Sequence, residues 1–178
     1  MEITELLIND HHEVNQLFGR FSRASKPETL DELAKQIIHE LSVHAAIEEQ
    51  FVYPVVRVKV ANGSRMADHG IEEHHEVKQL LVELEKGDAS TAGFAETMKK
   101  VASAVHDHVG DEEGEVLPAL REATGDGLRD KLGALAEGAK SLVPTHPHPL
   151  VPGKATAQMV AGPWASLLDR TRDLVGLT

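Results

Sequence analysis

One short helical pattern occurs twice in this chain: a histidine followed four residues later by the first of two consecutive glutamates. The copies occupy residues 44–49 and 108–113, and each reaches a proline, Pro54 or Pro118, ten residues after its histidine. On a helix, a spacing of four places both side chains on one face, one turn apart. The pattern predicts two helices that each present an imidazole and a carboxylate to the same neighbour.

Two further histidines stand upstream of these pairs in matching positions. The segment Asp-His-His-Glu-Val at residues 10–14 is echoed by Glu-His-His-Glu-Val at residues 73–77. His11 precedes the first pair by 33 residues, and His74 precedes the second by 34. Because self-similarity at a fixed period indicates a repeated structural unit, we expect one helix–loop–helix unit to occur twice.

Four amphipathic helices are expected, at about residues 3–24, 28–53, 65–86 and 90–123. The polar residues of the repeated pattern fall within their apolar stripes, as His11 does between Leu7 and Val14. Short connections between such helices favour antiparallel neighbours. The expected fold class is therefore all-α, an antiparallel up-down-up-down four-helix bundle over residues 1–124, with Pro54 ending or kinking the second helix.

The composition of the chain changes after residue 124. Residues 125–140 are expected to form a short helical extension, with its helix at 128–136 between glycines. Five of the eight prolines lie between residues 144 and 163, which predicts an extended linker. Apolar residues at 164–175 have the spacing of a short helix. Residues 141–178 are thus interpreted as a proline-rich linker and a short C-terminal helix.

Composition excludes several classes of function. The chain has 178 residues, no cysteine and a formal net charge of −11. Without cysteine there are no disulfides, thiolate metal sites or cysteine nucleophiles. The negative charge disfavours nucleic acid, whose phosphates it would repel. With no signal-peptide pattern and no apolar run of about 18 residues, a cytoplasmic protein that does not enter a membrane is expected.

The polar side chains on the inward stripes are difficult to explain as packing alone. Burying an ionised carboxylate without compensation is strongly unfavourable, so two carboxylates beside four imidazoles indicate bound cations. Such ligands suit iron, manganese or zinc, and the absence of thiolates argues against a structural zinc site. Carboxylates that bridge favour a centre of two metal ions. The predicted metal ligands are His11, His44, Glu48, His74, His108 and Glu112.

The chain contains a single histidine followed by a histidine–glutamate pair, and this order occurs twice. It resembles the motif order of the hemerythrin-like (HHE cation-binding) domain. The resemblance covers residues 3 to about 122. It implies two iron ions with an oxo or hydroxo bridge, held by the six ligands above, with both glutamates bridging. Glu113 stays an alternative to Glu112, because oxygen-carrying hemerythrins place this carboxylate five residues after the histidine.

The sequence departs from the oxygen carriers at Lys78, where they have a further histidine. A protonated lysine does not ligate a metal, so an open position on each ion is expected. The resemblance implies binding of O2, NO or hydrogen peroxide, with peroxide decomposition or an oxidase activity if the chain is an enzyme. The alternatives are a non-catalytic oxygen or iron sensor or carrier that signals through the tail to an unidentified protein partner, and a structural metal bundle.

The remaining histidines are interpreted as lying outside the centre. His12 and His75 lie about 100° around the helix from the ligands beside them, as surface groups or hydrogen-bond partners of the site. Tyr53 is expected to be a core aromatic residue, with a hydrogen-bonding or redox role as the alternative. The residues expected to be exposed are His39, His69 and His106.

Overall fold

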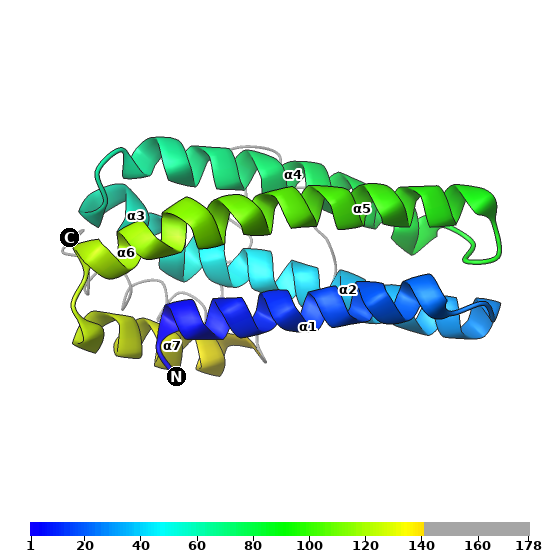
Figure 1. The fold of residues 1–178 in the computed structure, drawn as a ribbon, viewed down its shortest axis with the longest axis horizontal. Coiled ribbons are helices and arrows are strands. Elements are labelled where there is room, and N and C mark those ends of the chain that lie inside the picture. Colours follow the sequence, from blue (N-terminus) through cyan, green and yellow to red (C-terminus); the bar gives the residue numbers. More distant parts are fainter. Residues whose placement is uncertain (141–178) are drawn as a thin grey trace, which may run out of the picture.

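A computed structural model describes residues 1–140, which form a helical bundle (Figure 1). The expected all-α antiparallel bundle is confirmed, whereas the proline-rich linker and last helix predicted for 141–178 lie outside the described residues. Among the described helices, none is both long and apolar enough to cross a membrane. In chain order, the segments are α1 (Ile3–Arg23), α2 (Pro27–Ile47), the π-helical η1 (Glu48–Val52), α3 (Tyr53–Lys59), α4 (Gly63–Lys86), α5 (Ala92–Asp111), the π-helical η2 (Glu112–Val116), α6 (Leu117–Ala123) and α7 (Asp126–Lys140).

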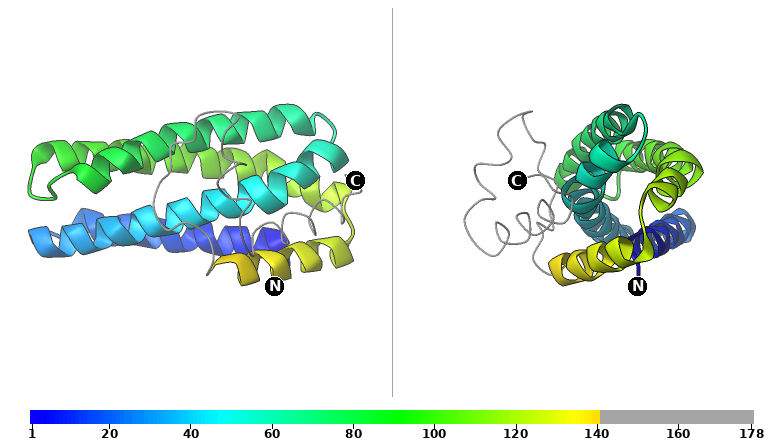
Figure 2. Two further views of the ribbon diagram at one scale, coloured as in Figure 1. Left: turned by 180° about the vertical axis from the view of Figure 1, so that it is seen from behind. Right: turned by 90° about the vertical axis from the view of Figure 1, so that its left-hand side faces the viewer.

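Four long rods make up the bundle, and each repeated unit contributes two of them. In the first unit α1 packs against α2, which continues through η1 into α3, and in the second unit α4 packs against α5, which continues through η2 into α6. Contacts of α2 and α3 with α4 join the two units. The end-on view in Figure 2 shows the rods arranged around a common axis. This arrangement brings the inward stripes of both units together.

The second and fourth rods each contain one π-helical turn where the sequence carries its paired glutamates. Pro54 and Pro118 lie in the first turn of the helices that follow, α3 and α6. A proline has no N–H to donate and clashes with the carbonyl four residues earlier; a π turn, which is wider, accommodates it. The second rod therefore does not end at Pro54 but continues to Lys59.

A layer of buried polar side chains divides the hydrophobic core into two clusters. One cluster lies around Phe51, Tyr53 and Leu120, towards α3, α6 and α7. The other includes Val14 and Leu81 and fills the opposite end of the bundle. The six predicted ligands lie between the two clusters, and none is more than 6% exposed. Because buried polar groups are unfavourable unless they are paired or bind an ion, this layer is the part of the fold that needs a chemical explanation.

Helix α7 lies outside the four rods and packs against α1 and α2 (Figure 1). It extends over Asp126–Lys140, longer than the predicted 128–136, because Leu132, Ala136 and Ala139 are buried against the bundle. A Cβ atom on Gly133 would lie 2.1 Å from the Met1 carbonyl oxygen, so this contact requires glycine. The division of the chain at residue 124 stays a prediction.

Candidate metal centre

Each of the four rods places one histidine in the polar layer. The Nε2 atoms of His11 and His44, from the first repeated unit, lie 3.2 Å apart. The Nε2 atoms of His74 and His108, from the second unit, also lie 3.2 Å apart. Ligand atoms at about 2.1 Å from one metal ion and in adjacent octahedral positions are separated by about 3 Å. The two Nε2 atoms of each imidazole pair therefore have the spacing of two neighbouring ligands of one metal ion.

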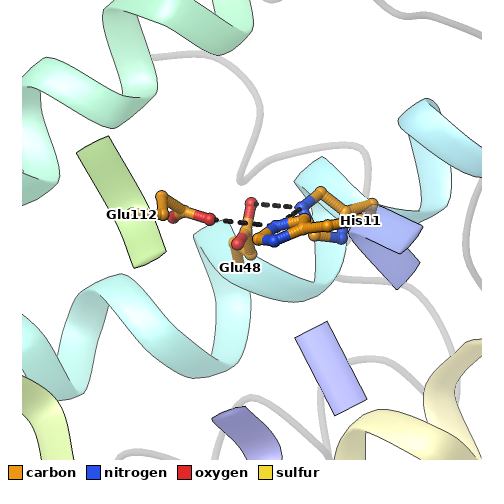
Figure 3. A group of neighbouring side chains, drawn as sticks. His11, Glu48 and Glu112 are labelled. Atoms are coloured by element: carbon orange, nitrogen blue, oxygen red, sulfur yellow. Dashed lines mark hydrogen bonds and ion pairs between the residues drawn. The ribbon is translucent and has the colours of Figure 1, made fainter. Parts of the chain in front are cut away.

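The two buried glutamates extend from the π turns into the polar layer, and Figure 3 shows both of them directed towards His11. Glu48 Oε2 lies 3.2 Å from His44 Nε2 and 3.1 Å from His74 Nε2, so it reaches both pairs. Glu112 Oε2 lies 3.4 Å from His11 Nε2 and 3.7 Å from His108 Nε2. Each carboxylate therefore contacts at least one histidine of each unit, as a bridging ligand would.

The Nδ1 side of each imidazole faces a second carboxylate, away from the middle of the layer. Three Nδ1 atoms hydrogen bond at 2.8–2.9 Å, and the fourth lies 3.8 Å from a carboxylate oxygen, beyond hydrogen-bond length. In histidine metal ligands, such a partner fixes the ring orientation and leaves Nε2 for the metal. The pairs are His11 with Glu113, His74 with Glu49, His108 with Glu73 and, at the longer distance, His44 with Asp10.

This arrangement of hydrogen bonds determines what the middle of the layer lacks. A neutral imidazole that donates from Nδ1 to a carboxylate carries a lone pair on Nε2. The Nε2 atoms of His74 and His108 would then direct lone pairs at each other and at the oxygens of Glu48. These groups repel one another unless protons or metal ions lie among them.

Without metal, protons supply that positive charge. Burial alone would lower the pKa of His44, but the negative charge of Glu48 outweighs it and raises the pKa to about 10. Burial is likewise outweighed at His108, where the carboxylates of Glu48 and Glu112 raise the pKa to about 9. Burial, with the charge of Glu48 added, raises the pKa of Glu112, whereas the surrounding imidazoles overcome burial and lower the pKa of Glu48. The metal-free site therefore holds protons that a metal ion would displace.

The buried donor atoms of the layer would be satisfied better by metal ions than by hydrogen bonds to one another. Both oxygens of Glu48 and Oε2 of Glu112 are buried and have no hydrogen-bond partner within the described part of the chain. Unpaired buried carboxylate oxygens are costly, and coordination is a common way of satisfying them. The atoms fall into two groups that share Glu48. One is His11, His44, Glu48 and Glu112, and the other is Glu48, His74 and His108.

Comparison with known families identifies this arrangement. The model of the hemerythrin HHE cation-binding domain matches residues 2–120. The chain belongs to this family. Membership implies metal binding, and the histidine and glutamate groups of this HHE domain fit a metal site.

Two further proteins and one solved structure are similar to this HHE domain. An uncharacterised hemerythrin-like protein of Schizosaccharomyces pombe is 26% identical over 174 residues, covering 97% of this chain and 86% of the relative. A Nostoc protein named DNA nickase is 29% identical over 143 residues, which are 80% of this chain but only 40% of that protein. The crystal structure of a hemerythrin HHE cation-binding domain-containing protein from Mycobacterium kansasii superimposes with a TM-score of 0.71 over 96% of this chain and 99% of that one, at 19% identity. This last likeness concerns the fold.

A small cavity opens beside the histidines of this HHE domain. It provides about 20 Å³ for the centres of water-sized molecules, and a buried water needs roughly 10–15 Å³ by this measure. The four histidines line one side, and apolar residues of the second core cluster, such as Val14, Leu81 and Val105, line the other. Lys78 also lines it, with its ammonium paired to Glu49 Oε1 at 2.6 Å. The cavity thus has room for one small molecule beside the four histidines.

Tyr53 lies on the opposite side of the polar layer from this cavity. It is buried in the first core cluster, as predicted for a core aromatic, but its hydroxyl also donates a 3.0 Å hydrogen bond to Glu112 Oε1. Burial raises the pKa of Tyr53, and the charges of Glu48 and Glu112 add to this, so the phenol stays protonated. The expected core aromatic is therefore confirmed, and Tyr53 also makes the hydrogen bond that was the alternative, through which it orients a proposed ligand.

Replacement of Gly70 by alanine is expected to disturb this hydrogen bond. A Cβ atom at Gly70 would lie 2.4 Å from the Tyr53 hydroxyl oxygen and 2.7 Å from the ring carbon that bears it. Overpacking of this kind costs about 1–3 kcal/mol, which denaturant unfolding of the variant would measure. Gly110→Ala is the matched control, since that helical glycine has open space around it and alanine favours helix. Equal stabilities of the two variants would contradict this packing.

The other polar residues are arranged largely as the sequence suggested. His12, His69 and His106 are exposed, while His75 is half-buried and bonded to Gln79. His39, expected to be exposed, is half-buried. Glu113, the alternative to Glu112, faces the Nδ1 atom of a histidine and not the middle of the layer. The sequence analysis missed three carboxylates that face Nδ1 atoms, although each is next to a predicted ligand in the sequence. Asp10 directly precedes His11, Glu73 directly precedes His74, and Glu49 directly follows Glu48.

Proposed function

We propose that this chain binds two iron ions through His11, His44, Glu48, His74, His108 and Glu112, and uses them to bind and decompose hydrogen peroxide. The cavity carries this proposal, because it leaves room for a small molecule beside the four histidines that are the proposed ligands. O2 and NO are of similar size and are the other proposed ligands.

The two groups of ligand atoms support a pair of ions and not one. His11 and His44 would hold one ion, His74 and His108 the other, and Glu48 and Glu112 would bridge them. Two octahedral ions have about twelve coordination positions, more than four imidazole nitrogens and four carboxylate oxygens fill. Positions therefore remain for a bridging oxygen and for an external ligand. Lys78 supplies no further donor, because its ammonium is paired with Glu49.

Peroxide decomposition converts two hydrogen peroxide molecules into O2 and two water molecules, so electrons and protons balance without another reductant. When bound, an iron pair that alternates between ferrous and ferric states supplies and recovers the two electrons. The chain holds the Nε2 atoms in place through the carboxylates on Nδ1 and holds Glu112 through the Tyr53 hydroxyl. The apolar wall of the cavity limits the entry of water.

Oxygen evolution tests this proposal directly. Iron-loaded protein is mixed with hydrogen peroxide in an oxygen electrode, with metal-free protein and free iron at equal concentration as controls. One O2 released for every two peroxide molecules consumed, over many turnovers, is the expected result. Reversible uptake of one O2 per iron pair without turnover would instead support the carrier, and an iron-loaded protein with neither property would contradict the proposal.

The stem of Lys78 is expected to set the size of the ligand. Its side chain is only 11% exposed and covers part of the cavity while its ammonium is anchored on Glu49. Lys78→Ala removes that stem, so turnover of tert-butyl hydroperoxide relative to hydrogen peroxide is expected to rise at least about threefold, roughly 0.7 kcal/mol. Lys78→Met keeps a long stem without the charge and is expected to retain the wild-type ratio. An unchanged ratio in the alanine variant would show that the stem does not limit access.

A further inference from the structure

A third histidine–glutamate pair with a spacing of four lies on α4, outside the centre described above. His69 and Glu73 repeat the spacing found at His44 and Glu48, and Asp111 approaches them from the end of α5. His69 Nε2 lies 3.5 Å from Glu73 Oε1 and 3.4 Å from Asp111 Oδ2. One imidazole nitrogen and two carboxylates from two helices thus converge on one point at the surface.

The distances in this cluster match those of the buried centre. There, the distances from the histidine Nε2 atoms to the carboxylates of Glu48 and Glu112 are 3.1–3.8 Å, longer than normal charge-assisted hydrogen bonds. In the surface cluster the three donor atoms all lie within 4.8 Å of one another. Donors bound to one ion at about 2.1 Å lie about 3 Å apart, so a small inward movement of exposed side chains completes the site.

The surface cluster differs from the buried centre in its access to solvent. The side chains of His69 and Asp111 are 57% and 61% exposed, whereas that of Glu73 is 21% exposed. A hydrated ion can therefore reach the outer donors directly. The buried ligands, none more than 6% exposed, offer no comparable approach.

Glu73 connects the surface cluster with the buried centre. Its Oε1 atom faces His69, while its Oε2 atom accepts a 2.8 Å hydrogen bond from Nδ1 of His108. One carboxylate thus belongs both to the surface cluster and to the shell that orients a proposed ligand of the buried centre. An ion that draws Glu73 outwards would loosen His108 and so open the buried layer beside it.

We propose that His69, Glu73 and Asp111 form a solvent-facing site for a divalent first-row transition metal ion, and that iron passes through it to load the buried centre. The donor set of one imidazole and two carboxylates suits Fe2+, Mn2+, Co2+ or Zn2+. With only three protein ligands and an exposed position, the site binds its ion weakly and exchanges it. The loading role rests on the proposed function, because the buried iron centre is its destination.

Titration with Mn2+ tests the surface site. Iron-loaded protein is titrated while electron paramagnetic resonance measures free Mn2+. Wild type is expected to bind one additional ion, and His69→Ala and Asp111→Asn to bind it at least tenfold more weakly. The matched control is His106→Ala, which changes an exposed histidine of α5 outside the cluster and is expected to behave as wild type. Equal Mn2+ binding by wild type and the two variants would overturn the site.

The rate of iron uptake tests the loading role. Metal-free protein is mixed with Fe2+ under anaerobic conditions, and bound iron is measured over time and at completion. The His69 and Asp111 variants are expected to load at least tenfold more slowly but to reach the wild-type iron content, since neither residue is a buried ligand. Unchanged rates would overturn the loading role. A wild-type protein that takes up no buried iron would instead contradict the proposed function, so the two failures are distinguishable.

Discussion

Replacement of Glu48 by glutamine is expected to lower the affinity for metal by about a hundredfold or more. Loss of a residue that only hydrogen bonds to a metal ligand typically lowers this affinity by about 10–100-fold. Glu48 is fully buried and is the residue shared by both groups of donor atoms. An amide has nearly the same shape as a carboxylate but carries no negative charge. It can neither bridge two cations nor balance their charge, so both ions should be lost together.

Two further variants make this series informative. Glu113→Gln weakens only the hydrogen bond to His11 Nδ1, so a smaller loss of about 10–100-fold is expected. Glu115→Gln changes an exposed residue that pairs with Arg65, and its metal content is expected to be unchanged. Metal per chain, measured by mass spectrometry after dialysis, and circular dichroism together separate lost binding from lost folding. A folded Glu48→Gln protein that retains wild-type metal would contradict the ligand assignment.

Removal of the metal is expected to lower the melting temperature by roughly 10 °C. A ligand present at about a thousand times its dissociation constant stabilises the folded state by about 4 kcal/mol, and for a domain of this size each kcal/mol shifts melting by about 2–4 °C. Chelated and reloaded samples of the same protein provide the comparison. A chelated, demonstrably metal-free protein with an unchanged melting temperature would show that the buried layer does not depend on metal.

The size of this stabilisation is also expected to depend on pH. In the metal-free chain, the raised pKa values of His44 and His108, about 10 and about 9, mean that the folded state keeps protons that the unfolded chain has lost. Their contribution to stability is fully present below about pH 6.5, the unfolded value, and is lost as the pH rises through 9 to 10. Metal binding needs neutral imidazoles and releases these protons, so it strengthens as the pH rises.

The difference in melting temperature between loaded and metal-free protein should therefore widen between pH 6.5 and 9. Differential scanning calorimetry of both forms across this range measures it. His106→Ala serves as a control because that exposed histidine lies outside the layer and is expected to leave the trend unchanged. A difference that stays constant or narrows over this range would mean that metal does not replace protons at these imidazoles.

The fold and the inward position of the six polar residues were predictable because the same pattern of apolar and ligand residues occurs twice in the sequence. A histidine within an apolar stripe, as His11 is between Leu7 and Val14, must face the core if the helix packs at all. The spacing of four between His108 and Glu112 then assigns both to one face. Local periodicity, repeated in two units, was sufficient for this conclusion.

The outer carboxylates and the π turns were not predictable in the same way. Glu49 serves His74, and Glu113 serves His11, so each pairing crosses from one repeated unit to the other. Only the packing of the rods determines which carboxylate meets which imidazole. The π turns follow from the prolines ten residues after the histidine of each pair, but a periodicity of 3.6 residues does not distinguish a break at Pro54 from a widened turn.

The metal content of the purified protein, with its visible spectrum, tests the central claim most directly. Protons or cations must lie among four imidazoles and two carboxylates that are closed off from water. We therefore expect two iron ions per chain, charge-transfer absorption in the visible range, and loss of the iron together with this absorption in Glu48→Gln. A folded protein that takes up no metal when iron is supplied would contradict this claim.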